Sequence, residues 1–178
     1  YVKIFRSNVK QADDLYLKTG TDYNELLQQL SEKDVLKDSL AFVYTAKLKR
    51  FNRVLPGRYI IKENMSNNEL INMLRGGRQT PVKVTFNNLR HTDALAGRTA
   101  RQIEADSAAL SQCFRNDSIL REYGFNRQTV LAAFIPDTYE FYWNTSACGF
   151  FKRMIKAYEK FWNKERRAKA DAAGLSPM

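Results

Sequence analysis

The residues best suited to chemistry gather in one stretch, LAAFIPDTYEFYWNTS, at positions 131–146. Aromatic side chains surround a Pro-Asp-Thr-Tyr step, and a carboxylate, Glu140, follows it directly. A glutamate enclosed by aromatic groups can act as a general acid, because desolvation favours its protonated form. The stretch is therefore either the working face of an enzyme or a strand preceded by a rigid turn.

Strand alternation separates Glu140 from the aromatic cluster. Successive side chains of a β-strand point to opposite faces, so Tyr139, Phe141 and Trp143 share one face. Glu140 points to the other face, beside Thr138. We therefore expect a solvated glutamate on a strand face rather than a catalytic acid.

Asp137 is expected to shape the turn. Pro136 fixes its own backbone φ, and an aspartate directly after it can accept hydrogen bonds from nearby backbone amides. Such a turn would aim the following strand at a cleft without touching a substrate.

Other candidates for chemistry are sparse. His91 is the single histidine, and its place near a helix start favours a surface or capping role. Cys113 and Cys148 are too few and too far apart for a zinc site, and two cysteines leave a disulfide open. The sequence holds no metal-ligand cluster or glycine-rich phosphate loop, so we expect no metal and no cofactor.

The net charge favours a polyanionic neighbour. The 178 residues carry a formal charge of +10, and basic residues are densest between 152 and 169. Anionic lipid, acidic cell-wall polymer and nucleic acid all fit such a charge. The sequence lacks a ribonucleoprotein, helix-turn-helix or zinc-finger signature, so nucleic acid is not expected, although a basic nucleic-acid-binding module remains an alternative.

Periodicity and capping signals predict helices and strands along the whole chain. Residues 14–18 and 58–61 read as strands, with helices between them after residue 22 and over 35–49. The first helix has Thr21 or Asp22 as its cap. A further helix is capped by Ser66 and ends at Gly76-Gly77. A strand over 81–86 and a turn at Asn87-Asn88 follow it. The remaining elements are helices, from Thr92 or Asp93 to about 105, and over 117–123, 127–133 and 149–170.

The order of these segments resembles the YceG-like family of membrane-anchored endolytic murein transglycosylases. The resemblance covers roughly Tyr16 to the end of the chain and depends on order and spacing more than on one motif. The stretches that carry it are Leu55–Ile61 with the helix up to Gly77, Val82–Phe86 with its following helix, and Phe134–Phe141 with Asn144-Thr145 and the lysine-rich helix.

The resemblance implies an α+β fold in two parts. Residues 1–80 would form a LysM-like strand-helix-helix-strand subdomain, and residues 81–178 the mostly helical start of a YceG-like catalytic domain. It implies glycan contacts for Tyr59, Asn64, Tyr139, Tyr142 and Trp143. The family's usual Glu-Gly pair before the aromatic-Pro-Asp-Thr sequence is replaced here by Leu131-Ala132.

The resemblance also implies a function for the parent protein. A lytic transglycosylase needs one carboxylic acid, which protonates the leaving oxygen and then deprotonates the sugar hydroxyl that forms a 1,6-anhydro end. In this family that glutamate follows a Gly-Leu-Pro-like segment, which Gly174-Leu-Ser-Pro-Met178 approaches. We therefore expect a glycan-binding chain that is inactive alone and lacks the membrane anchor and the catalytic glutamate.

The partners implied are peptidoglycan strands at the periplasmic side of the bacterial inner membrane. Cell-wall synthesis proteins and an anionic membrane surface are further candidate partners. A membrane-surface interaction scaffold is the third hypothesis for the chain, and it does not exclude the first.

Overall fold

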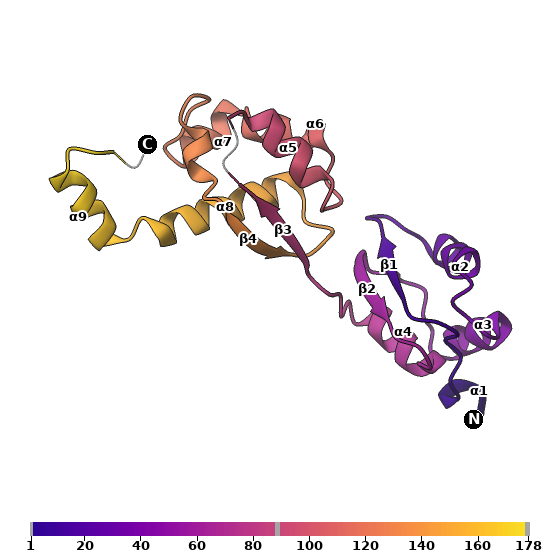
Figure 1. Cartoon of the computed structure of the whole chain (residues 1–178). Helices are drawn as coiled ribbons and strands as arrows, with labels where there is room; N and C mark the ends of the chain where they lie inside the picture. The colour runs from indigo at the N-terminus through magenta and orange to yellow at the C-terminus, as the bar shows by residue number, and fades with distance from the viewer. Residues whose placement is uncertain (1, 88–89, 177–178) are drawn as a thin grey trace. The chain divides into compact units, whose positions relative to one another are not determined.

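A computed structural model describes residues 2–87 and 90–176, and contacts divide the chain into two compact units. The first unit contains residues 1–81 and 142–144, and the second contains residues 82–141 and 145–178. Both units mix helices with a small antiparallel sheet, so the fold is α+β (Figure 1). The expected turn at Asn87-Asn88 falls partly outside the described residues, because Asn88 is not among them.

The first unit is built on one pair of strands. Leu15 of one strand lies opposite Tyr59 of the other in an antiparallel register, and alternate residues of both strands are buried. This unit has the elements α1 Val2–Phe5, β1 Asp13–Leu17, α2 Tyr23–Glu32, α3 Ser39–Leu48, β2 Gly57–Ile61 and α4 Asn67–Arg75. The strand-helix-helix-strand order from β1 to β2 is therefore present.

Capping boxes set the starts of two helices in this unit. The Asp22 carboxylate accepts from the backbone N–H of Glu25 at 2.8 Å, and Glu25 accepts from the N–H of Asp22 at 3.0 Å. Ser66 and Glu69 make the same reciprocal pair at the start of α4. Each box satisfies backbone donors that would otherwise lack partners, so both predicted caps are confirmed.

Helix α3 is shorter than the sequence pattern indicated. It begins at Ser39 rather than Val35, because Asp38 caps it by accepting from the N–H of Ala41 at 2.9 Å. Val35 is instead a buried core residue in an extended segment whose neighbour Leu36 bridges to Val9.

The second unit holds the other pair of strands, in which Val84 lies opposite Tyr139. Rings of Phe86 and Phe141 contact Phe150 of the long helix α8, which runs beside this pair (Figure 1). The elements are β3 Val82–Phe86, α5 Thr92–Ala100, α6 Ser107–Phe114, α7 Asp117–Glu122, the 3₁₀ helix η1 Val130–Ala133, β4 Asp137–Phe141, α8 Ala147–Phe161 and α9 Lys164–Ala172.

The expected helix over 149–170 is two helices. Trp162 leaves helical geometry with ψ of 62°, and Asn163 then caps α9 by accepting from the N–H of Arg166 at 2.9 Å. An asparagine at this position offers the backbone a cap that competes with continued helix. The prediction of one continuous helix was therefore wrong.

Two other boundaries also differ from the sequence pattern. Helix α5 follows His91 at its N-cap position without a side-chain hydrogen bond, and it ends at Ala100. The predicted helix over 127–133 is a turn followed by η1, because the Asn126 side chain accepts from the N–H groups of Gln128 and Thr129. Among the helices that the structure describes, none is long and apolar enough to cross a membrane.

Candidate functional site

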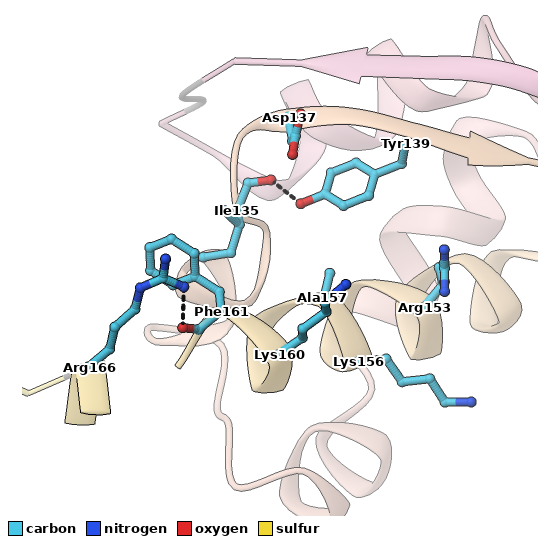
Figure 2. Close-up of a pocket in the computed structure, with 9 residues that line it drawn as sticks. All are labelled: Ile135, Asp137, Tyr139, Arg153, Lys156, Ala157, Lys160, Phe161 and Arg166. Carbon is cyan, nitrogen blue, oxygen red and sulfur yellow. Dashed lines mark hydrogen bonds between the residues drawn. The ribbon is translucent and has the colours of Figure 1, made fainter. Parts of the chain in front are cut away.

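The chain bends at Pro136 and enters β4 at Asp137, and we call this bend with the first residues of β4, up to Tyr139, the Pro-Asp-Thr-Tyr turn. The Tyr139 phenol donates to the backbone carbonyl of Ile135 at 2.6 Å (Figure 2). The N–H of Thr138 donates to Oδ1 of Asp137 at 2.7 Å. Asp137 therefore bonds a backbone amide as predicted, but that amide belongs to the next residue of β4 and not to a turn that follows Asp137.

Tyr139 joins this turn to the core of the second unit. Its ring stacks on Phe86, with centroids 5.6 Å apart and planes inclined by 20°. Burial raises the pKa of the phenol, the nearby Asp137 carboxylate raises it further, and the Arg153 guanidinium opposes both. Tyr139 thus remains a neutral hydrogen-bond donor at physiological pH.

A pocket of about 520 Å³ lies between this turn and the basic side of α8. Figure 2 shows the turn with Asp137 and Tyr139 across from α8, with Arg166 of α9 at one end. The lining residues are Ile135, Asp137, Tyr139, Arg153, Lys156, Ala157, Lys160, Phe161 and Arg166.

The pocket is strongly electropositive. Arg153, Lys156, Lys160 and Arg166 line it together with one carboxylate, Asp137. In the part of the chain that the structure describes, no salt bridge within 4.0 Å engages any of these four cations. Their charges are therefore available to an anionic ligand.

Arg166 is held at the rim by Phe161. Its guanidinium carbon lies 4.3 Å from the centre of the Phe161 ring, and Nη1 donates to the Phe161 carbonyl at 2.7 Å. Arg166 lies in the first turn of α9, and its side chain reaches across the break at Trp162-Asn163 to the last residue of α8. A planar cation stacked on an aromatic ring is well placed to meet a carboxylate or phosphate.

Glu140 stands outside this pocket. It is exposed on the outer face of β4, where it lies opposite Lys83 of β3. Tyr139 is half-buried and Phe141 is buried on the inner face. The expected solvated position of Glu140 is therefore confirmed.

The aromatic residues that the sequence grouped together belong to different units. Tyr142 is 56% exposed, beyond the end of β4. Trp143 is half-buried and lies edge-on to Tyr16, with ring centroids 5.1 Å apart. Contacts assign both residues to the first unit, whereas Tyr139 belongs to the second, so the three do not form one surface within either unit.

Tyr59 is placed where a glycan cannot reach its side chain. Its ring is 0% exposed in the core of the first unit, and its hydroxyl donates to the Leu55 carbonyl at 2.9 Å. The strand-helix junction suggested a surface residue, but the inward register of β2 turns this side chain into the core. The proposed glycan contact by Tyr59 is corrected accordingly.

Asn64, by contrast, lies at the surface of the first unit. Its Oδ1 accepts from Ser7 and from Lys37, each at 3.1 Å, and its φ of 63° suits an asparagine in a turn. Asn64 also lines a groove of about 620 Å³ that includes Asn8 and Asp38.

The contact between the basic helix and the Pro-Asp-Thr-Tyr turn was not evident from the sequence. The signal was present as cations at 153, 156 and 160, whose spacing puts them on one side of a helix. What the spacing did not reveal was that this side meets the turn.

Among the described residues, no group of three or more His, Cys, Asp or Glu side chains could hold a metal ion.

The family model described as "YceG-like family" matches residues 15–178. The chain belongs to the YceG-like family. A solved structure described as a yceG-like protein from Listeria monocytogenes is similar to this YceG-like chain at 17% identity and a TM-score of 0.48. That similarity covers 94% of this chain and 60% of the Listeria chain, so the YceG-like chain spans less than two thirds of that protein. No curated protein sequence matches the chain significantly.

Proposed function

We propose that this chain is the peptidoglycan-binding part of an endolytic lytic transglycosylase. The observation that carries the proposal is the electropositive pocket against the Pro-Asp-Thr-Tyr turn in a member of the YceG-like family. The parent protein would cleave glycan strands internally and leave 1,6-anhydro ends, at the periplasmic side of the inner membrane.

The pocket suggests which part of peptidoglycan it recognises. Stem peptides of peptidoglycan carry free carboxylates, and a lactyl group carries one only where its stem peptide is absent, whereas the sugar rings themselves are neutral. Arg153, Lys156 and Lys160 offer charge to such carboxylates, and the exposed edge of Tyr139 offers an apolar surface. We assign the anionic stem rather than the bare sugar to this pocket.

The first unit supplies the second binding surface in this proposal. Residues 1–80 would act as a LysM-like glycan-binding subdomain, and the groove beside Asn64 is its candidate contact. Tyr142 and Trp143 remain candidate sugar contacts of the same unit. Residues 81–178 would form the start of the catalytic domain.

Cleavage is expected to need a carboxylic acid outside this chain. A glycosidic general acid is normally held protonated in a partly desolvated cleft. Asp137, which lines the pocket, and Glu140, which lies outside it, are both exposed. The chain is therefore proposed to bind peptidoglycan without cutting it.

Binding is tested by sedimentation with insoluble peptidoglycan. Lys156→Glu reverses one charge in the pocket, and we expect it to weaken binding roughly fivefold. Lys164→Glu is the matched control, because it changes the same charge at an exposed position of α9 that does not line the pocket. Equal losses in both variants would show a diffuse effect of charge and would contradict the assignment of this pocket.

Activity is tested separately by mass spectrometry of muropeptides. Intact peptidoglycan is incubated with this chain or with a longer chain that continues past Met178. Anhydro ends from the longer chain alone support the proposal, whereas ends from this chain would place the acid within it. Binding to generic duplex DNA or to anionic vesicles in preference to peptidoglycan would favour the nucleic-acid or membrane-surface hypothesis.

A further inference from the structure

Two thiols meet in the second unit, away from the electropositive pocket. Sγ of Cys113 lies 2.9 Å from Sγ of Cys148, although the residues are 35 positions apart in the chain. No disulfide joins the two cysteines in this structure. Cys113 belongs to the last turn of α6, and Cys148 to the first turn of α8.

The separation of the sulfurs is close to that of a disulfide. An S–S bond is about 2.05 Å long, so the two sulfurs need to approach by only about 0.9 Å. Both helices belong to the same unit, and Leu110 and Phe114 of α6 share its core with Phe151 of α8. The packing of α6 against α8 therefore already holds the two sulfurs in contact.

The two thiols differ in access. Cys148 is exposed, whereas Cys113 is 4% exposed and lies in the hydrophobic core. Burial and, to a smaller extent, the neighbouring Cys148 raise the pKa of the Cys113 thiol to about 12, against the opposing charge of Lys152. An external reagent therefore meets Cys148 first, and Cys113 is reachable only from Cys148.

Positive charge lies close to Cys148. Cys148 lies in the first turn of α8, where backbone N–H groups lack helical partners and stabilise negative charge. Ser146 caps this turn by accepting from the N–H of Gly149 at 3.1 Å, and Lys152 follows one turn later. Both the helix end and the Lys152 side chain therefore place positive charge on the side of α8 where an anionic reagent would approach Cys148.

We propose that Cys113 and Cys148 form a thiol–disulfide exchange site, which takes an external disulfide as its oxidant and closes an intrachain disulfide between α6 and α8. The Cys148 thiolate attacks one sulfur of the external disulfide, and a mixed disulfide forms as one external thiol leaves. Cys113 then attacks Sγ of Cys148, and its proton passes to the departing external sulfur. A second external thiol leaves, so two cysteine thiols are oxidised and one external disulfide is reduced to two thiols.

Closure of this bond would fasten the start of α8 to the end of α6. Helix α8 carries Arg153, Lys156 and Lys160, so the crosslink would stabilise the helix that supports the pocket. The inference does not depend on which ligand the pocket binds. It requires only an oxidising environment, in which structural disulfides persist.

Oxidised glutathione is the probe, and intact mass with peptide mapping is the readout. For the wild-type chain we expect a loss of two hydrogens, an intrachain Cys113–Cys148 peptide and no retained glutathione. Cys113→Ala should instead retain one glutathione on Cys148, because the resolving thiol is gone. Cys148→Ser should retain none, since the remaining thiol is buried.

Thermal unfolding of the wild type gives an independent measurement that needs no variant. The melting temperature of the oxidised chain should exceed that of the reduced chain by roughly 10 °C, because the crosslink restricts the unfolded state. A stable glutathione adduct on the wild type, two free thiols after oxidation, or disulfide-linked dimers in place of the intrachain bond would each overturn the proposal.

Discussion

The phenol of Tyr139 donates a hydrogen bond to the backbone carbonyl of Ile135, across the intervening Pro136. The bond is 2.6 Å long and joins Ile135, shortly after the end of η1, to Tyr139 in the middle of β4. It fixes the turn that forms one wall of the electropositive pocket, so a side chain singled out as a candidate sugar contact also has a structural role.

Tyr139→Phe should destabilise the second unit modestly. The ring can keep its stacking on Phe86, but the Ile135 carbonyl loses its donor. Loss of one such bond costs about 1 kcal/mol, which thermal or urea unfolding can measure. An unchanged free energy of unfolding would show that solvent replaces this hydrogen bond without cost.

Tyr59→Phe should lower the stability of the first unit by about 1 kcal/mol, since it removes the donor to Leu55. It should leave peptidoglycan binding unchanged, because the ring is buried. Asn64→Gly is the paired variant: glycine accepts a φ of 63° and removes only the exposed side chain. Weaker binding in Asn64→Gly but not in Tyr59→Phe is the expected pattern, and the reverse pattern would contradict both placements.

Glu69 should contribute a pH-dependent share of stability. Hydrogen bonds from the backbone N–H of Ser66 at 2.8 Å and from its hydroxyl at 2.7 Å lower the pKa of Glu69 below its ordinary value of 4.5. A carboxyl group whose pKa is lower in the folded state than in the unfolded state stabilises the protein at pH values above its unfolded-state pKa. This stabilisation disappears as the pH falls through the folded-state pKa. The melting temperature of wild type should therefore exceed that of Glu69→Gln most at neutral pH.

The same comparison at lower pH provides the control. The difference in melting temperature between wild type and Glu69→Gln should shrink as pH falls from about 5 to below the depressed pKa. A difference that stays constant across this window would mean that the ionised carboxylate adds nothing to the cap beyond what glutamine provides.

Gly97 and Gly124 offer a matched pair that isolates backbone conformation. An added Cβ would meet nothing within 4 Å at either site. Gly97 lies inside α5, so Gly97→Ala should stabilise the protein by about 1 kcal/mol. Gly124 has a φ of 75°, and Gly124→Ala should destabilise by about 1 kcal/mol because a Cβ is strained there. Equal effects in urea unfolding would contradict this assignment.

Local chemistry in the sequence determined several features of this protein. The caps at Asp22 and Ser66 required only a side chain and the backbone three residues later, so spacing alone revealed them. The outward position of Glu140 followed from the two-residue period of a strand. Such features involve few residues that are close in sequence, which is why no tertiary information was needed.

Tertiary structure decided the features that join distant residues. The inward register of β2 buried Tyr59, and the meeting of α8 with the turn at Asp137 created the electropositive pocket. The approach of Cys113 to Cys148 required α6 and α8 to pack together across 35 residues of chain. Periodicity indicates which face of a helix or strand is apolar. Which element packs against that face depends on the burial of the whole core, and no single segment of the sequence specifies it.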